Sequence, residues 1–253
     1  MACKPQVVAV IPARYASSRF PGKPLATIAG KPMIEHVWAR ARAAASVDRV
    51  LVATDDRRIA DAVAAFGGRA VMTSPDHATG TDRIAEAIAN TPGDLVVNLQ
   101  GDEPLVPPAV IDDVVQALWT AQAPMGTVAV PFCQIAASPD DPNAVKVVVD
   151  RNGYALYFSR SRIPFERSGG TPVEPLLHWG LYAYRREFLE QFVSWPRGRL
   201  EACEMLEQLR ALENNARIVV VETTAQSIGV DVPEDIPVVE AALRKEQGDA
   251  AAV

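Results

Sequence analysis

The first part of the chain alternates short apolar runs with longer amphipathic stretches. Val7 to Ile11 is a continuous run of apolar, mostly β-branched residues, which is typical of a strand buried on both faces of a parallel sheet. Similar runs recur at residues 50–53, 70–72 and 95–99, and helical patterns occupy residues 32–45, 58–66, 81–90 and 107–121. This alternation predicts βαβ units, and hence an α/β fold with a Rossmann-like, mostly parallel sheet.

The pattern changes from Thr127 onward. Strand-like segments follow at residues 127–131, 146–150 and 154–158 with little helix between them. The last two flank Asn152-Gly153, a dipeptide that strongly favours a tight hairpin. We therefore predict an antiparallel insertion at about residues 132–184, within a single domain that spans residues 1–246. Helices are expected again at residues 186–194, 200–212 and 233–245, and residues 247–253 are expected to fray.

Composition narrows the class of protein. With 253 residues, 49% of them apolar and 22% charged, the chain can bury a large core without disulfides or metals. Its formal net charge is −6, and no run of like charge favours a nucleic-acid or membrane partner. The three cysteines form no C-x-x-C pair, and no apolar run approaches the ~18 residues of a membrane span. These features, with an N-terminus that enters a strand directly, predict a cytoplasmic protein.

A long basic loop follows the first predicted strand. It has about 20 residues and contains four prolines, and it carries the cations Arg14, Arg19 and Lys23 within ten positions. Loops of this length inside a domain are usually functional, and this one leaves the strand end where α/β proteins bind ligands. Guanidinium forks and an ammonium suit phosphate oxygens, although a solvated basic loop is the alternative. Neither G-x-x-x-x-G-K-[ST] nor G-x-G-x-x-G is present, so the site differs from a P-loop and from a dinucleotide fingerprint.

Two aspartates follow apolar segments and are candidate metal ligands. Asp102 comes directly after the strand-like run in LVVNLQGDEP, where Gly101 leaves room for close approach of a ligand. Carboxylates at such a strand end suit Mg²⁺, which proteins usually hold with one or two carboxylates plus substrate phosphates. Asp231 lies in IGVDVPED, and there a second interpretation is open, because Asp231 and Glu234 have the spacing of a helix capping box.

The second half holds polar groups among aromatic residues. Arg160 follows the predicted hairpin and could clamp a carboxylate, and His178 and Tyr182 could bind hydroxyl groups. The alternative is an edge hairpin decorated with amphipathic aromatic side chains. Further on, three glutamates recur every third residue, at positions 201, 204 and 207. On a continuous helix such a stripe shares one face and is usually solvated.

Taken in order, these segments resemble the 3-deoxy-D-manno-octulosonate (KDO) cytidylyltransferases, the CMP-KDO synthetases of lipopolysaccharide assembly. The similarity covers the chain from about Val7 to Ile236. The first-loop and LQGDEP segments are shared more loosely with other nucleotidyltransferases, whereas FSR, HxGxYxYR and EMLEQLR are specific to the family. The segments that carry the resemblance are IPARYASSRFPGKPL, ATD at 53–55, DHATGTDR, VNLQGDEP, NAVKVV, YALYFSR, HWGLYAYR, LEACEMLEQLR and GVDVPED.

The resemblance implies a fold of the nucleotide-diphospho-sugar transferase type and a reaction in which CTP and KDO give CMP-KDO and pyrophosphate. It assigns catalytic roles to Arg14, Lys23, Asp102 and Asp231, the two aspartates holding Mg²⁺. The residues implied to bind CTP are Arg14, Arg19 and Lys23 at the triphosphate, and Gln100, Thr79, Gly80, Thr81 and Arg83 at the cytidine. Those implied to bind the sugar acid are Arg160, His178, Tyr182, Glu207 and Gln208. It also implies a homodimer paired through the antiparallel insertion.

Spacing alone suggests that Asp231 is a helix cap and that the glutamate face is solvated surface. The resemblance opposes both interpretations, because it assigns Asp231 to the metal and Glu207 and Gln208 to the sugar acid. Other hypotheses remain open. A related enzyme, such as a CMP-sialate or 8-amino-KDO synthetase, would share the phosphate end and differ at the sugar-acid residues. A non-catalytic CTP-binding regulator on the same fold predicts loss of the metal carboxylates, yet Asp102 and Asp231 are both present. The stretch between Ile163 and His178 is short for the family, which leaves the cover of the sugar pocket undefined.

Overall fold

A computed structural model describes residues 4–16 and 20–251 of the chain. It forms two compact units. The first contains the described parts of Met1–Asp94, Asn98–Ile111 and Ser227–Val253, and the second contains Leu95–Val97 and Asp112–Gln226. Within the described residues, no helix combines the length and the apolar character needed to cross a membrane.

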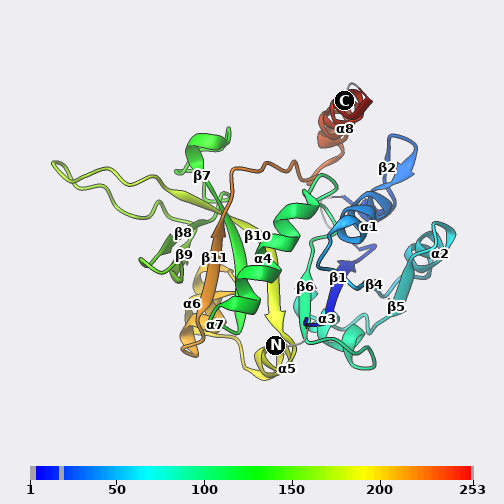
Figure 1. Cartoon of the computed structure of the whole chain (residues 1–253), viewed down its shortest axis with the longest axis horizontal. Coiled ribbons are helices and arrows are strands. Elements are labelled where there is room, and N and C mark those ends of the chain that lie inside the picture. The colour runs from blue at the N-terminus through cyan, green and yellow to red at the C-terminus, as the bar shows by residue number, and fades with distance from the viewer. Residues whose placement is uncertain (1–3, 17–19, 252–253) are drawn as a thin grey trace. The chain divides into compact units, whose positions relative to one another are not determined.

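The first unit is built on three parallel strands, β1 (Val7–Ala13), β4 (Arg49–Thr54) and β5 (Arg69–Met72). The residues of β1 from Val7 to Ile11 are at most 1% exposed, as expected for a continuous apolar run. The helices α1 (Met33–Ala43), α2 (Arg57–Ala65) and α3 (Gly80–Ile88) follow these strands in the βαβ order that the sequence predicts (Figure 1). The apolar positions of each helix supply its buried side chains, which accounts for the predicted boundaries within a few residues.

Segments from both ends of the chain meet in a separate apolar cluster of the first unit. The short turn η1 (Lys23–Leu25) leads into the hairpin of β2 (Thr27–Ile28) and β3 (Lys31–Pro32), and η3 (Pro233–Asp235) leads into α8 (Ile236–Ala251). The cluster consists of Ile28, Met33, Leu105, Val230, Val239 and Leu243. It therefore joins the first loop to the segments that carry the two aspartates. Helix α8 extends through Ala251, whereas we expected residues 247–253 to fray.

The second unit contains a mixed sheet. Strand β7 (Met125–Pro131) pairs parallel to β11 (Ile218–Glu222) and antiparallel to β10 (Leu176–Arg185). Strand β10 also pairs with β8 (Lys146–Val149), which forms an antiparallel hairpin with β9 (Ala155–Ser159). Gly153 has φ 77° in the turn, so the hairpin predicted at Asn152-Gly153 is confirmed. The α/β class with an antiparallel insertion is likewise confirmed, whereas β11 is a strand that the periodicity did not predict.

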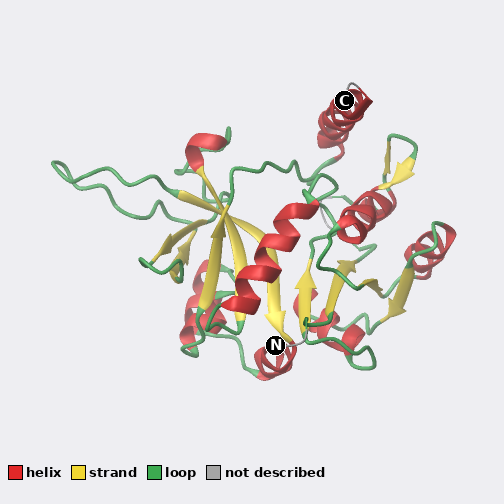
Figure 2. Ribbon diagram, viewed as in Figure 1, coloured by secondary structure: helices red, strands yellow, loops and turns green. Residues whose placement is uncertain are grey.

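The remaining elements of this part of the chain are β6 (Leu95–Asn98), α4 (Pro108–Thr120), η2 (Phe132–Gln134) and α5 (Arg186–Ser194). Strand β6, α4 and α5 agree with the sequence prediction, α5 at both ends. Figure 2 draws the connection between β9 and β10 as a long loop that extends away from the strands. Phe165 in this loop is 86% exposed, so its ring has few neighbours in the described chain.

The helix predicted at residues 200–212 is wrong, because the chain forms two short helices there. They are α6 (Arg199–Glu204) and α7 (Leu209–Glu213), and Met205 between them has φ 54° in the left-handed region. Across the break, Arg210 donates to Glu201 at 2.6 and 2.8 Å in a buried ion pair. The glutamates at 201, 204 and 207 therefore do not lie along one helix face, and each enters a different set of contacts.

Candidate active site

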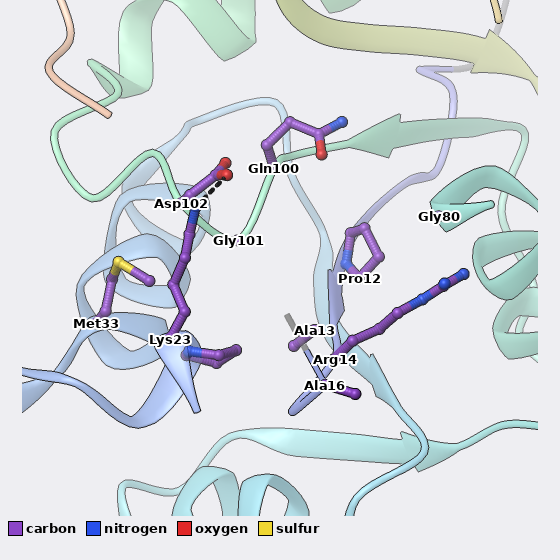
Figure 3. A pocket seen from close by; sticks show the side chains of 11 residues that line it. Pro12, Ala13, Arg14, Ala16, Lys23, Met33, Gly80, Gln100, Gly101 and Asp102 are labelled. Atoms are coloured by element: carbon purple, nitrogen blue, oxygen red, sulfur yellow. Dashed lines mark hydrogen bonds and ion pairs between the residues drawn. The ribbon is translucent and has the colours of Figure 1, made fainter. Parts of the chain in front are cut away.

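A cavity of about 400 Å³ lies at the carboxyl end of β1 in the first unit (Figure 3). It is bounded by the first loop, by the start of α3 and by the segment after β6. Its lining residues are Pro12, Ala13, Arg14, Ala16, Lys23, Pro24, Met33, Gly80, Gln100, Gly101 and Asp102. The cavity thus brings together four of the residues predicted to bind nucleotide and one predicted metal ligand. Arg19 belongs to residues 17–19, which lie outside the described chain.

Lys23 lies between the two predicted metal ligands. Its Nζ is 2.7 Å from Asp102 Oδ2 and 3.4 Å from Asp231 Oδ1 (the first pair is dashed in Figure 3). A backbone hydrogen bond from Val230 N to Asp102 O, 2.9 Å long, holds the two aspartate segments side by side. The prediction that Asp102 and Asp231 share a site therefore agrees with their positions, although they are 129 residues apart in the chain.

The alternative that Asp231 caps the following helix is wrong. The N-cap residue of η3 is Val232, and the carboxylate of Asp235 accepts from the N–H groups of Asp231 at 2.7 Å and of Val232 at 3.0 Å. The Asp231 side chain is 58% exposed and its carboxylate faces Lys23.

Arg14 is anchored toward the start of α3. Its guanidinium donates to the backbone oxygen of His77 at 2.7 Å, and the imidazole of His77 pairs with Glu86. Thr79 is the N-cap of α3 and forms a capping box with Asp82. Gly80 and Arg14 therefore reach one side of the cavity, opposite Lys23 and Asp102.

Gly101 is required by the close approach of two backbone segments. A Cβ at this position would lie 3.0 Å from the carbonyl oxygen of Pro12, closer than nearly all real contacts. The missing side chain thus lets the segment after β6 pack on the end of β1, and places Gln100 and Asp102 at the cavity. The amide of Gln100 donates to Asn98 Oδ1 at 3.3 Å, which fixes one end of the side chain.

Arg83 and Thr81 lie inside the unit instead of lining the cavity. Arg83 is fully buried, and its guanidinium donates to Asp55 Oδ2 at 2.9 Å and to the hydroxyl of Thr73 at 2.5 Å. Thr81 is 2% exposed. A direct contact of either side chain with cytidine therefore needs a rearrangement, and Arg83 in this structure fixes the ATD segment through Asp55.

The second unit carries the residues predicted to bind the sugar acid. Arg160 is held by backbone oxygens, since its Nε donates to Glu204 O at 2.8 Å and one terminal nitrogen donates to Pro142 O at 3.0 Å. The carboxylate of Glu204 in turn accepts from Arg160 N at 2.9 Å and from Ser159 Oγ at 2.7 Å. This network leaves Arg160 with further guanidinium N–H groups for a ligand carboxylate.

His178 is neutral at ordinary pH, because burial lowers its pKa from 6.5 to about 3. Its Nε2 lies 3.0 Å from Thr127 Oγ1, and that hydroxyl also lies 2.9 Å from Leu181 O. The Thr127 hydroxyl donates its one hydrogen to a carbonyl oxygen, so toward His178 it can only accept. Nε2 therefore carries the imidazole hydrogen and donates it, and Nδ1 remains an acceptor. The ring of Tyr182 lies 5.3 Å away, and burial raises the pKa of its hydroxyl. Both groups suit neutral hydroxyl partners.

Glu207 and Gln208 lie at the break between α6 and α7. Glu207 Oε1 is 3.5 Å from the guanidinium of Arg210. Gln208 is 3% exposed, and its Nε2 has no hydrogen-bond partner in the described chain. A buried amide without a partner is costly, and a ligand oxygen would satisfy it. The placement agrees with the sugar-acid assignment and not with the expectation of a solvated face.

Three further residues support the predicted site residues and escaped the sequence prediction. Lys146 is fully buried in β8, and its ammonium donates to the backbone oxygens of Asp141 and Arg160, while burial lowers its pKa. The lysine at the head of an apolar strand was the available signal. In the first unit the Arg58 guanidinium lies 3.3 Å over the ring of Tyr15, at the base of the first loop. Nothing in the sequence pattern indicates that pair.

The donor set at Lys23 fits a magnesium ion in its chemistry. Two carboxylates converge there on a positive charge, and Mg²⁺ takes oxygen ligands and completes its shell with phosphate oxygens and water. Among the described residues, no group of three or more His, Cys, Asp or Glu side chains gathers in a metal-binding arrangement. A metal held here would therefore depend on a phosphorylated ligand for its other positions.

An α/β unit with cations and carboxylates over a strand end defines the class of nucleotide-binding transferases with phosphate-directed sites. The sequence profile of the family described as cytidylyltransferase matches residues 8–218. A 3-deoxy-manno-octulosonate cytidylyltransferase of Syntrophotalea carbinolica is 55% identical over 94% of this chain and 98% of its own length. One from Myxococcus xanthus is 52% identical over 96% of this chain and 98% of its own. The chain belongs to the 3-deoxy-manno-octulosonate cytidylyltransferases, a group within the cytidylyltransferase family.

Solved structures agree with this assignment. A CMP:2-keto-3-deoxy-manno-octonic acid synthetase complexed with CTP has a TM-score of 0.90 at 44% identity, covering 95% of this chain and 99% of its own. A cytidylyltransferase from Leptospira borgpetersenii has a TM-score of 0.64 at 17% identity, covering 95% of this chain and 87% of its own. The second likeness concerns the fold alone, whereas the first extends to sequence.

Proposed function

We propose that the protein transfers CMP from CTP to 3-deoxy-D-manno-octulosonate and releases pyrophosphate, a step of lipopolysaccharide assembly. The observation that carries the proposal is the cavity at the end of β1, where Arg14, Lys23 and Asp102 converge. The names of relatives at 50–55% identity support the same substrate pair. In the reaction the anomeric hydroxyl oxygen loses its proton and bonds to the α-phosphorus, and the bond from that phosphorus to the oxygen it shares with the β-phosphorus breaks, so that this oxygen leaves as a terminal oxygen of pyrophosphate.

Positioning and charge neutralisation account for catalysis in this proposal. Phosphoryl-type transfer needs little covalent help from a protein, so a nucleophilic serine or cysteine is not required. Arg14 and Lys23 hold the triphosphate, and Arg19 is assigned to it by resemblance. Gln100 and the turn at Thr79 and Gly80 bind the nucleoside.

Magnesium is the metal that we propose for the two aspartates. Asp102 and Asp231 would hold it, as the convergence of both carboxylates on one positive charge suggests. When bound, Mg²⁺ neutralises phosphate charge and favours ionisation of the attacking hydroxyl. The other groups of the site act without it: Lys23 and Arg14 orient the triphosphate, and they balance the charge that develops on the leaving pyrophosphate.

For the sugar acid we propose the residues of the second unit. Arg160 binds the carboxylate through its remaining N–H groups, His178 accepts from a sugar hydroxyl at Nδ1, and Gln208 donates from its buried amide. Tyr182 and Glu207 complete the set. Because His178 stays neutral, it adds no positive charge to the carboxylate pocket.

The test is a pyrophosphate-release assay with CTP, Mg²⁺ and KDO. Parallel samples replace CTP with UTP, replace KDO with sialate or 8-amino-KDO, or contain EDTA. Release only with CTP, KDO and metal supports the proposal, whereas turnover of another sugar acid in place of KDO contradicts the substrate. The variant Asp102→Asn is expected to bind CTP and to lose nearly all turnover; Asp94→Asn, which removes an exposed carboxylate near the start of β6, is the matched control.

A cytoplasmic homodimer is the assembly that we propose. The antiparallel insertion carries exposed apolar side chains: Leu156 is 61%, Phe165 86% and Val173 64% exposed. Exposed apolar groups of this size often mark protein interfaces. Light scattering after size-exclusion chromatography distinguishes the dimer from a monomer, and Phe165→Asp is expected to shift the protein toward the monomer.

A further inference from the structure

Lys23 is the least exposed member of a three-charge cluster. Its side chain is 13% exposed, against 38% for Asp102 and 58% for Asp231. The ammonium therefore lies on the protein side of the cluster, with both carboxylates directed at it. A lysine that served only to attract phosphate would not need two carboxylate partners, which reduce its positive charge toward a ligand.

The backbone fixes all three residues of this cluster. Lys23 begins η1 after Gly22, whose φ of 72° makes the turn, and Lys23 N donates to Phe20 O at 3.2 Å. The aspartate segments are joined by the bond from Val230 N to Asp102 O. Since the three backbones are held, the lysine, with the longest side chain of the three, can move its charge furthest without unfolding part of the site.

The ammonium and a divalent cation compete for the same carboxylates. Both are cations, and a metal ion that bound the two aspartates would lie within a few ångströms of the ammonium in its present position. Repulsion between them disfavours metal binding until the ammonium leaves. A triphosphate in the cavity offers Lys23 several negative oxygens in exchange, and so can draw the ammonium away.

We infer that Lys23 couples metal binding to nucleotide binding. Without nucleotide, its ammonium neutralises Asp102 and Asp231 and suppresses the affinity of the pair for a divalent cation. With nucleotide, the ammonium moves to the triphosphate and the aspartates take the metal. This inference rests on the proposed function, since it assumes a nucleoside triphosphate in the cavity. Linkage requires that the metal raise the affinity for nucleotide by the same factor.

The experiment measures Mn²⁺ affinity of the full chain without nucleotide, by titration calorimetry. Mn²⁺ is the probe because it accepts the carboxylate, phosphate and water ligands that suit Mg²⁺. Lys23→Met, which keeps the length and removes the charge, is expected to bind Mn²⁺ about tenfold more tightly than the natural chain, within the usual range of coupling between sites. Lys23→Arg keeps the charge and is expected to stay near the natural affinity.

Lys31→Met is the matched control, because it removes a lysine charge that is 59% exposed and paired with Glu35. It is expected to leave Mn²⁺ affinity unchanged. Adding Asp231→Asn to Lys23→Met is expected to abolish the gain, which assigns the gain to the aspartates. Circular dichroism and thermal unfolding verify that each variant is folded.

A second measurement tests the coupling itself. CTP affinity is compared with saturating Mn²⁺ and with EDTA, without sugar acid. The ratio of the CTP affinity with Mn²⁺ to the CTP affinity with EDTA is expected to be about tenfold smaller in Lys23→Met than in the natural chain. Under each metal condition, complexation of Mn²⁺ by CTP is the same for every variant, so it cancels between variants.

The inference is overturned if folded Lys23→Met binds Mn²⁺ no more tightly than the natural chain, or if Lys31→Met gains as much. The turnover assay separates this from a failure of the proposed function. Turnover by the natural chain with no gain in Lys23→Met refutes the coupling alone. No CTP binding by the natural chain, with a gain in Lys23→Met, refutes the proposed function and leaves the competition for the aspartates standing.

Discussion

Glu204 is expected to set the affinity for the sugar acid without touching it. Its carboxylate accepts from Ser159 Oγ at 2.7 Å and from Arg160 N at 2.9 Å, and its backbone oxygen accepts from Arg160 Nε at 2.8 Å. The change Glu204→Ala removes the two carboxylate bonds and keeps the backbone bond. Arg160 then loses the support that fixes its backbone, and we expect its guanidinium to occupy the binding orientation less often.

The magnitude follows from the two lost bonds. A hydrogen bond to a charged group contributes about 1.5–3 kcal/mol, and water replaces part of each because Glu204 is only half-buried. If the whole net loss of about 2 kcal/mol weakens the binding of KDO by Arg160, KM for KDO rises about 30-fold. Glu204→Gln keeps one accepting oxygen, so about 1 kcal/mol and about fivefold are expected.

Steady-state kinetics with each substrate varied in turn provide the assay. KM for KDO is expected to rise, whereas KM for CTP is expected to stay within about twofold, because the CTP residues belong to another part of the chain. Glu190→Ala is the control, since Glu190 is 55% exposed and pairs with Arg186 along α5. An unchanged KM for KDO in Glu204→Ala, or equal rises for both substrates, would refute the reasoning.

Three other changes have definite expected results. Arg58→Ala removes the cation over Tyr15, worth about 0.5–1 kcal/mol, and is expected to raise KM for CTP by about two- to fivefold with little change in kcat. Burial lowers the pKa of His178 to about 3 in the folded chain, so as pH falls below 6.5 the unfolded chain takes up a proton that the folded chain does not, and the fold loses stability. His178→Gln is therefore expected to lose about 2 kcal/mol less stability than the natural chain between pH 7.5 and 5 in urea unfolding. Gly101→Ala places a Cβ 3.0 Å from Pro12 O and is expected to cost about 1–3 kcal/mol of stability.

Each expectation has a contrary outcome. Arg57 is an exposed neighbour paired with Asp61. If Arg57→Ala raised KM for CTP as much as Arg58→Ala does, the effect would come from the lost positive charge and not from the contact with Tyr15. If the stability difference between His178→Gln and the natural chain were the same at pH 7.5 and at pH 5, protonation would not be the cause of the effect. A Gly101→Ala variant as stable as the natural chain would show that the two backbone segments have room to separate.

The elements of the first unit follow from the sequence because local pattern and burial agree there. The apolar run at Val7–Ile11 is a buried strand, and the helix patterns after each strand give α1, α2 and α3. Thr79 caps α3 with the residue types that capping requires. In such segments a single period decides the structure, so prediction succeeds without knowledge of the tertiary fold.

The break between α6 and α7 was not predictable in this way. Residues 200–212 have apolar positions that fit one helix, and no glycine or proline marks an end. The chain breaks at Met205, where the buried pair of Glu201 and Arg210 holds α6 against α7. Tertiary contacts thus override a local preference that costs only fractions of a kcal/mol per residue.

The candidate site illustrates the same limit at longer range. Lys23 contacts Asp231 across 208 positions of sequence, and the two are brought together by a backbone bond and an apolar cluster that no periodicity reveals. Spacing alone favoured Asp231 as a cap, because the residues after it have the composition of a helix start. Resemblance to a family placed Asp231 beside Asp102, but gave Lys23 no role toward either carboxylate. That role follows from the ion pairs themselves: a lysine that neutralises both aspartates must be displaced before they can serve a metal.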